Sequence, residues 1–254
     1  MKIIILGNCG QDLASRQYVS SYLVNDNVAI DAGCLGLCGS PHDQERVRHV
    51  LLTHAHADHT ASLPFFIENV WTPSPDCPTL YGSAETLATV RRSIFNDEVW
   101  PDFVAMSEGM PPFVRVQTVQ PEVPINVGGL TITPVKVNHT VPTLGYVVQD
   151  GRSAVIFAGD SGPTNRIWEV AREVPHLKAV FLEASFPNRM KEIAEAAMHL
   201  TSEMFGREAA KVPAGVKIIA VHMKVRYRDE ITRELQALRL PCLEIGECHQ
   251  DYVF

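Results

Sequence analysis

The sequence is short of positive charge and has no long hydrophobic run. Its 254 residues include 22 Lys and Arg against 29 Asp and Glu, which gives a formal net charge of −7. Proteins that bind long nucleic acids neutralise many phosphates with Lys and Arg, so long nucleic acid is not an expected partner of this chain. No stretch approaches the ~20 apolar residues that cross a membrane, and we therefore expect no membrane partner either.

From the sequence we also expect neither a disulfide framework nor a signal peptide. The six cysteines show no paired framework of the kind that stabilises small secreted domains. Cys34 and Cys38 lie in a Gly-rich loop without a histidine that completes a convincing metal set, so we interpret them as core residues or free thiols. The first apolar stretch, 3–6, is shorter than the ~7–15-residue core of a signal peptide. Together these features predict a cytoplasmic location.

Ser- or Gly-rich linkers, low-complexity segments and repeats by residue identity are absent as well. The chain is 46% hydrophobic, so it can bury a sizeable core. We therefore predict a single domain over residues 1–254.

Short apolar runs separated by turn residues predict many short strands. The expected strands are 3–6, 20–24, 28–30, 50–52, 80–82, 114–119, 125–127, 130–137, 143–149, 154–158, 179–182, 216–221 and 242–245. Helices are expected at 61–68, 84–95, 165–173, 190–200, 202–211 and 229–238, and a short helix is expected to end over 44–49. A strand-rich group is followed by mixed strands and helices, twice. This order predicts an α/β (α+β) fold with two mixed β-sheets stacked face to face and helices outside.

The densest cluster of reactive side chains follows the apolar run 50–52. Residues 53 to 59 read Thr-His-Ala-His-Ala-Asp-His, which places His54, His56, Asp58 and His59 within six positions. Imidazole and carboxylate groups suit zinc and other borderline divalent metals. Four such groups on one tight turn are costly to bury without a cation. The pattern therefore predicts a metal site here, and a merely polar, solvated loop is the alternative reading.

This H-x-H-x-D-H order resembles the metal motif of the metallo-β-lactamase superfamily. The resemblance implies a four-layer αββα sandwich that holds one or two metals at its edge. Members hydrolyse phosphodiesters, lactams, lactones or thioesters, so the motif specifies the fold and says little about the substrate.

Three further ligand-type residues each follow a predicted strand. They are His139, Asp160 and His222. Each alone is a weak signal, because a histidine at a strand end is more often structural or on the surface. In the order His, Asp, His after the 54–59 motif, they match the superfamily throughout.

The resemblance implies how these residues divide between two metals. His54, His56 and His139 would hold one metal, Asp58, His59 and His222 the other, and Asp160 would bridge both. Two divalent metals ~3.5–4 Å apart can share a hydroxide nucleophile, and Asp58 would also orient or deprotonate that water. Zinc, manganese and iron all accept such ligands; we expect zinc.

Asp31 ends the predicted strand 28–30, where the superfamily usually has a supporting aspartate. One interpretation is that it accepts a hydrogen bond from a ligating imidazole and fixes the tautomer of that ring. The other is that it caps the turn after the strand. The sequence leaves both open.

The segment 182–201 distinguishes branches of the superfamily. Glu183 ends a predicted strand in Glu-Ala-Ser-Phe-Pro-Asn, and His199 follows in His-Leu-Thr. These segments resemble the class II 3′,5′-cyclic-nucleotide phosphodiesterases and also ribonuclease Z, in which a Glu–His pair protonates the leaving oxygen. A sugar alkoxide is a poor leaving group, and an imidazolium oriented by a carboxylate can donate a proton near neutral pH. The alternative is that Glu183 is a strand-end charge and His199 a surface residue.

The resemblance therefore implies a binuclear metal-dependent phosphodiesterase. The nucleophile would be a metal-bridging hydroxide, and His199 with Glu183 would be the leaving-group acid. We expect a small phosphodiester, a 3′,5′-cyclic nucleotide, because the chain is acidic and lacks a long Gly- and basic-rich insertion for tRNA. The N-terminal loop, 7–12, departs from the usual start of ribonuclease Z, and somewhat from the usual start of the cyclic-nucleotide enzymes as well.

Three alternatives stay open from the sequence. The first is a ribonuclease Z-like tRNA 3′-endonuclease, since the segment that contains Lys224, Arg226 and Tyr227 resembles both branches and Lys224 or Arg226 could contact a phosphate. The second is a lactone or thioester hydrolase in which Glu183 and His199 are structural. The third is a non-catalytic metal-binding scaffold, against which the full ligand set argues. A homodimer is compatible with the resemblance.

Overall fold

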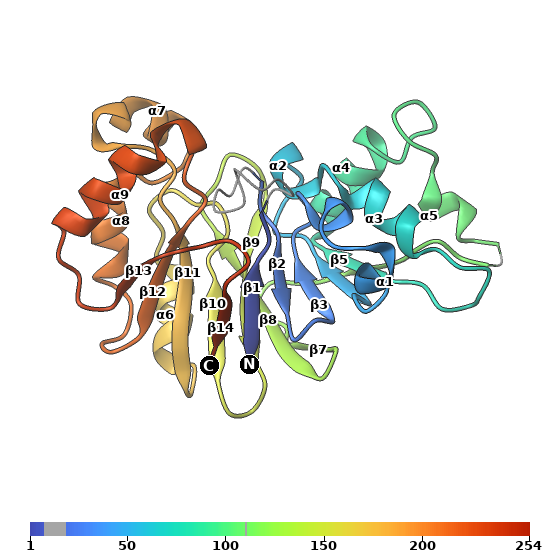
Figure 1. Cartoon of the computed structure of the whole chain (residues 1–254), viewed down its shortest axis with the longest axis horizontal. Helices are drawn as coiled ribbons and strands as arrows, with labels where there is room; N and C mark the ends of the chain where they lie inside the picture. Colours follow the sequence, from blue (N-terminus) through green and yellow to red (C-terminus); the bar gives the residue numbers. More distant parts are fainter. Residues whose placement is uncertain (8–18, 110) are drawn as a thin grey trace. The chain divides into compact units, whose positions relative to one another are not determined.

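The computed structural model describes residues 1–7, 19–109 and 111–254. The chain forms two compact units, which we name by their place in the sequence. The N-terminal unit comprises Lys2–Gln120 and Cys248–Val253, and the C-terminal unit comprises Pro121–Glu247 with Met1 and Phe254. Figure 1 labels most of the strands and α-helices of both units.

The N-terminal unit is built on a seven-stranded mixed sheet with the order β14-β1-β2-β3-β4-β5-β6. Its strands are β1 (Lys2–Ile5), β2 (Tyr22–Val24), β3 (Val28–Ile30), β4 (His49–Leu51), β5 (Thr79–Gly82), β6 (Arg115–Thr118) and β14 (Asp251–Val253). The strands from β14 to β3 pair antiparallel, and those from β3 to β6 pair parallel. Asn25 and Asp26 have φ of 49° and 57°, the left-handed geometry that a tight hairpin between β2 and β3 requires.

Helices pack on this sheet around an apolar core. They are η1 (Leu35–Leu37), α1 (Pro41–Gln44), α2 (Ala57–Thr60), α3 (Leu63–Val70), α4 (Ala84–Ser93) and α5 (Phe103–Met106). Phe66 on α3 and Val90 on α4 are buried against Leu52 and Leu80 of the sheet region. Ser83 caps α4 because its hydroxyl accepts a hydrogen bond from the N–H of Thr86 at 3.1 Å.

The C-terminal unit has a second seven-stranded mixed sheet, with the order β13-β12-β11-β10-β9-β8-β7. Its strands are β7 (Ile125–Val127), β8 (Leu130–Val137), β9 (Thr143–Gln149), β10 (Ala154–Phe157), β11 (Leu177–Glu183), β12 (Lys217–Val221) and β13 (Leu243–Ile245). From β7 to β10 the pairs are antiparallel, and from β10 to β13 they are parallel. Every residue of β10 is buried, which explains its continuous apolar sequence.

The helices of this unit cover a core of their own. They are α6 (Arg166–Glu173), η2 (Asn188–Met190), α7 (Lys191–Ala196), α8 (Ser202–Ala209), η3 (Val225–Tyr227) and α9 (Arg228–Ala237). Trp168 on α6, Phe205 on α8 and Leu235 on α9 are buried in one cluster with Val180 of β11. Within the described ranges, no helix is both long and apolar enough to cross a membrane.

Most of the predicted elements are present. The short helix expected to end over 44–49 is α1, which spans Pro41–Gln44 and so ends at the first residue of that range, while His49, its last residue, begins β4. Ser40 and Asp43 form a capping box at the start of α1, and Pro41 stands at its first turn. Strand β14 and helix α5 were not anticipated. Of the N-terminal loop 7–12, all but its first residue lies outside the described residues.

Candidate metal centre

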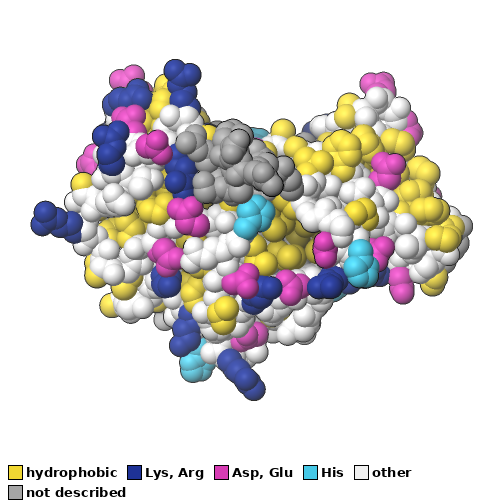
Figure 2. All heavy atoms as spheres, viewed as in Figure 1, with side chains coloured by type: hydrophobic (Ala, Val, Ile, Leu, Met, Phe, Trp, Pro, Cys, Tyr) yellow, Lys and Arg dark blue, Asp and Glu magenta, His cyan; other side chains and the backbone are white. Residues whose placement is uncertain are grey.

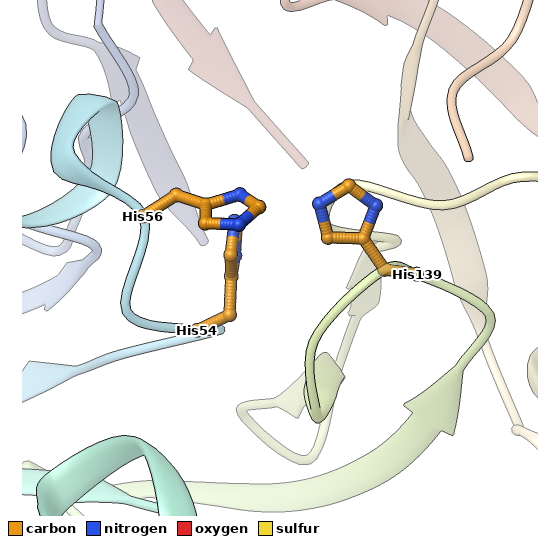
Figure 3. Close-up of side chains that lie close together, drawn as sticks. All are labelled: His54, His56 and His139. Carbon is orange, nitrogen blue, oxygen red and sulfur yellow. The ribbon is translucent and has the colours of Figure 1, made fainter. Parts of the chain in front are cut away.

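In the N-terminal unit, the histidine-rich motif joins the end of β4 to α2. His56 precedes the first residue of α2, and Asp58 and His59 lie on that helix. The rings of His54 and His56 are 4.5 Å apart between centroids in an edge-to-face arrangement, and those of His54 and His59 are 4.2 Å apart. Figure 3 shows His54 and His56 on this segment and His139 on the segment that follows β8. Within the N-terminal unit, the motif therefore brings the imidazoles of His54, His56 and His59 together.

Asp31 supports this loop from the end of β3. One carboxylate oxygen accepts the backbone N–H of Thr53 at 2.7 Å. The other lies 2.7 Å from Nδ1 of His59 and accepts the Thr53 hydroxyl at 2.8 Å. Asp31 has a φ of 61°, a left-handed conformation that is uncommon for residues other than glycine. The structure thus favours the first interpretation of Asp31, as the support of an imidazole.

In the C-terminal unit, the predicted ligands lie just past strand ends. His139 follows β8, Asp160 follows β10 and His222 follows β12 directly. Nδ1 of His139 lies 3.0 Å from the carbonyl oxygen of Met198. Nε2 of His222 lies 3.4 Å from Oδ2 of Asp160, and His222 has a φ of 57°. The sheet therefore brings these three residues to one edge, where the strands end.

Glu183 and His199 form a buried pair at the same edge. Nδ1 of His199 lies 2.7 Å from Oε1 of Glu183. The backbone N–H groups of Ser161 and Leu200 also donate to the Glu183 carboxylate, at 2.8 and 3.1 Å. Glu183 is 1% exposed and His199 is 7% exposed, so His199 is not the surface residue of the alternative reading.

Five side chains of the C-terminal unit lie close enough together to share a metal ion in sets of three. His139, Asp160 and His199 each offer a ligand atom, and these atoms lie within 4.8 Å of one another. The same holds for Glu183, His199 and His222. A set of imidazoles and carboxylates at this density is the donor chemistry of a divalent metal site.

The two histidines of this unit with resolved shifts are displaced in opposite directions. Burial lowers the pKa of His139, and the hydrogen bond to the Met198 carbonyl only partly offsets this, so its ring stays neutral as a ligand must. Burial also acts to lower the pKa of His199, but the neighbouring Glu183 carboxylate prevails and raises it. A raised pKa keeps His199 charged closer to neutral pH, which suits a proton donor.

The tautomers of these rings test whether a metal fits. A carbonyl or carboxylate oxygen can only accept a hydrogen bond, so His139 and His59 each hold their proton on Nδ1. In both rings, Nε2 then carries the lone pair that a metal requires. Metal-ligating histidines almost always donate their other N–H to such an acceptor. The residues present therefore fit a divalent metal.

Two hydroxyl groups beside these rings did not stand out in the sequence. Thr53 contacts Asp31, His54 and His59, and Ser185 contacts Glu183, His199 and His222. Their sequence signal is slight, since Thr53 merely precedes the motif and Ser185 is the serine of Glu-Ala-Ser. The assignment of the seven predicted ligands and of Asp58, Glu183 and His199 to roles stays a prediction.

The family model of the β-lactamase superfamily domain matches residues 27–223. The chain belongs to this superfamily. Among solved structures, the metallo-β-lactamase fold protein YhfI from Bacillus subtilis superposes with a TM-score of 0.73 at 20% identity, over 99% of this chain and 98% of the other. Unliganded yeast PDE1 gives a TM-score of 0.76 at 17% identity, over 96% of each chain. The predicted metallo-β-lactamase fold, with its two mixed sheets and helices, is confirmed.

Relatives by sequence carry names from both predicted branches. A probable 3′,5′-cyclic-nucleotide phosphodiesterase of Yersinia pestis is 23% identical over 213 residues, which cover 73% of this chain but only 60% of that protein. A ribonuclease Z of Kineococcus radiotolerans is 25% identical over 93% of this chain and 88% of its own length. An uncharacterized protein of Mycobacterium tuberculosis is 29% identical over 93% of this chain and 86% of that protein. The prediction of a metal-dependent hydrolase of the metallo-β-lactamase superfamily is confirmed.

Proposed function

We propose that this metallo-β-lactamase-fold protein is a binuclear phosphodiesterase that hydrolyses a small phosphodiester, a 3′,5′-cyclic nucleotide. The observation that carries the proposal is the buried Glu183–His199 pair, with 2.7 Å between Oε1 and Nδ1. Such a pair is needed when the leaving group is an alkoxide, which departs readily only if it is protonated. Hydrolysis of a lactone or thioester has no comparable need for it.

Seven residues would hold the metals. His54, His56 and His139 would bind one ion, Asp58, His59 and His222 the other, and Asp160 both. We propose zinc, which this nitrogen and oxygen donor set accepts, as it also does manganese and iron. Bound divalent ions would lower the pKa of water to ~7 and offset charge on the phosphate oxygens.

The acid–base work is done by the chain itself. Glu183 holds the Nδ1–H of His199, so Nε2–H is the bond that His199 directs to the departing 3′ oxygen. Because Ser161 and Leu200 also donate to Glu183, the carboxylate is fixed and the imidazole ring has little freedom to turn. Asp58 orients or deprotonates the attacking water. Its place one residue before His59 on α2 is compatible with both roles.

Charge supports a small substrate. On the face drawn in Figure 2, the described Lys and Arg side chains lie among Asp and Glu side chains. Tracking a long phosphate backbone instead takes a basic stripe or patch. The charge of Lys224 acts on His199, since it works to lower the pKa of that imidazole. We therefore propose Lys224 as a phosphate contact. A cytoplasmic location, and a homodimer as the assembled form, are further parts of the proposal.

A ribonuclease Z-like tRNA 3′-endonuclease is the second candidate. The match to the Kineococcus ribonuclease Z favours it, because it spans 93% of this chain and 88% of that enzyme. The same Glu183–His199 pair would then protonate the 3′ oxygen of the cleaved RNA. Binding of precursor tRNA would weaken steeply with salt concentration, whereas turnover of a small substrate would not.

One panel of substrates separates these functions. Metal-loaded protein would be assayed with cyclic AMP, cyclic GMP, bis(p-nitrophenyl) phosphate, precursor tRNA, a lactone and a cephalosporin. We expect turnover of a cyclic nucleotide. Activity on precursor tRNA alone would establish the second candidate, and activity on the lactone or cephalosporin alone would overturn both.

The leaving group provides a sharper test of the acid. His199→Ala should slow cyclic-nucleotide hydrolysis ~10²–10⁴-fold, the usual contribution of a positioned general acid. Bis(p-nitrophenyl) phosphate releases a stable phenolate, so the same variant should lose far less activity on it. Equal losses on the two substrates would remove His199 from the role of acid.

A further inference from the structure

Thr53 is a buried hydroxyl between a carboxylate and two imidazoles of the N-terminal unit. Its Oγ1 donates to Oδ2 of Asp31 at 2.8 Å. The same oxygen lies 3.0 Å from Nδ1 of His54 and 3.4 Å from Nδ1 of His59. Thr53 is 1% exposed, so water does not take the place of any of these contacts.

Ser185 occupies a matching position in the C-terminal unit. Its Oγ donates to Oε2 of Glu183 at 2.6 Å. It lies 3.0 Å from Nδ1 of His222 and 3.3 Å from Nδ1 of His199. The carbonyl oxygen of His222 is a second possible acceptor at 3.1 Å, but the carboxylate is nearer and charged, so it takes the hydroxyl proton.

A hydroxyl has one proton to donate and lone pairs that accept. In both units the proton goes to the carboxylate. The oxygen can then only accept from the nearby imidazole, and that imidazole must carry its own proton on Nδ1. For His54 and His222, Nε2 is left as the nitrogen with a lone pair.

We propose that Thr53 and Ser185 are positioning residues of the metal centre. Each hydroxyl transmits the charge of a carboxylate to one ligand imidazole, His54 or His222, and locks that ring in the Nδ1–H tautomer. The inference rests on the metal-binding part of the proposed function and not on the identity of the substrate. It also explains how one carboxylate per unit supports two imidazoles, the first directly and the second through the hydroxyl.

The tautomers can be measured without metal. In ¹⁵N-histidine-labelled apoprotein, the ring nitrogens of His54 and His222 should give the chemical shifts of a protonated Nδ1 and an unprotonated Nε2. His54→Gln and His222→Gln spectra assign the signals. A proton on Nε2 of either ring in the folded wild-type protein would overturn the proposal, and this measurement needs no hydroxyl variant to fold.

Matched variants test the effect on metal affinity. Thr53→Val keeps the shape of the side chain and removes the hydroxyl, whereas Thr53→Ser keeps the hydroxyl. Ser185→Ala removes the second hydroxyl. Ser202→Ala is its control, since Ser202 is equally buried and its hydroxyl has no hydrogen-bond partner among the described residues. Zinc affinity would be measured by competition with a fluorescent chelator, and folding by near-ultraviolet circular dichroism.

Thr53→Val and Ser185→Ala should each weaken zinc binding ~10–100-fold, the usual cost of removing such a partner of a metal ligand. Thr53→Ser and Ser202→Ala should bind zinc as the wild type does. If Thr53→Val and Ser185→Ala are less stable but bind zinc with full affinity, the hydroxyls are structural and the proposal fails. If the wild type binds no zinc, the metal centre of the proposed function fails as well. If zinc binds but no phosphodiester is cleaved, only the substrate assignment fails.

Discussion

In the N-terminal unit, the carboxylate that supports the histidines comes from the end of β3, whereas in the C-terminal unit it comes from the end of β11. The two sheets have the same arrangement, with antiparallel strands on one side and parallel strands on the other. Counted from the strand at the antiparallel edge, β4 is the fifth strand of its sheet and β11 is the fifth strand of the other. Thr53 and Ser185 each stand two residues beyond these fifth strands. The hydroxyl therefore follows the fifth strand in both sheets. The supporting acid follows the fourth strand, β3, in one sheet and ends the fifth strand, β11, in the other.

The acids also differ in the partners they hold. Asp31 lies 2.7 Å from His59, a predicted metal ligand, and Glu183 lies 2.7 Å from His199, the proposed proton donor. One hydrogen-bond geometry is therefore assigned two roles. Hydrogen-bond length alone does not distinguish a ligand from an acid, so the roles must be separated by measurement.

The largest expected effect separates those two histidines. His59→Ala should lose bound metal and, with it, turnover of a cyclic nucleotide. His199→Ala should lose ~10²–10⁴-fold in turnover but keep its metal content. Metal would be quantified by atomic emission on protein that has been dialysed against trace zinc. Loss of metal from His199→Ala to the same extent would show that the two histidines are equivalent ligands.

The next effect compares the two cores. Phe66 of α3 and Phe205 of α8 are both fully buried, at 0% exposure. Replacing either with alanine should lower the free energy of unfolding by ~3–5 kcal/mol, because a buried phenyl ring is lost and a cavity is left. Urea denaturation would measure this, with the leucine variants as milder controls. A loss of under ~1 kcal/mol at one site would show that the two cores do not contribute alike.

The smallest effect compares two hairpin turns. In the turn between β9 and β10, burial acts to raise the pKa of Asp150. The backbone N–H groups of Arg152 and Ser153 and the amine of Met1 outweigh it and lower the pKa to about 2. A carboxyl group with a depressed pKa stabilises the fold fully above its ordinary value of 3.8, and this contribution is lost as pH falls toward 2.

Asp150→Asn should therefore cost about 1–2 kcal/mol at pH 7, and the difference from wild type should shrink below pH 4. In the turn between β2 and β3, the carboxylate of the half-buried Asp26 forms an ion pair with the half-buried Lys2, at 3.2 Å. Asp26→Asn is the matched control and should have little effect at either pH, as surface ion pairs contribute little. Urea denaturation at pH 7, 4 and 3 measures both. If the difference in unfolding free energy between wild type and Asp150→Asn does not change with pH, the depressed pKa of Asp150 does not stabilise the fold.

Much of this molecule is readable from its sequence because the strands are short apolar runs that end in polar residues. The apolar residues Val50 and Leu51 predict β4, and the histidine-rich motif that follows them predicts a metal site. The polar stretch before β4 places the end of α1 only approximately, because α1 already ends at Gln44 and His49 belongs to the strand, where it contacts Tyr81 at 3.2 Å. A pairing of this kind is set by the neighbouring strand, which lies far away in sequence.

The hydroxyls were missed for a related reason. Threonine and serine are common, and nothing in the local sequence shows that the oxygen of Ser185 meets a ring 37 residues away at His222. Glu183 and His199 could be paired in advance only through a known family pattern. The local sequence does not show which strand ends lie next to one another. The order of the strands in the sheet decides this, and it brings together residues that are far apart in the sequence.

The last strand of the N-terminal sheet has a consequence for synthesis. β14 pairs antiparallel with β1, so Lys2 lies opposite Val253. A ribosome releases β1 long before β14, because the two strands lie far apart in the sequence. Until β14 emerges, β1 therefore keeps one bare strand edge, the type of surface on which other chains assemble. Closure of the N-terminal sheet waits for the synthesis of β14.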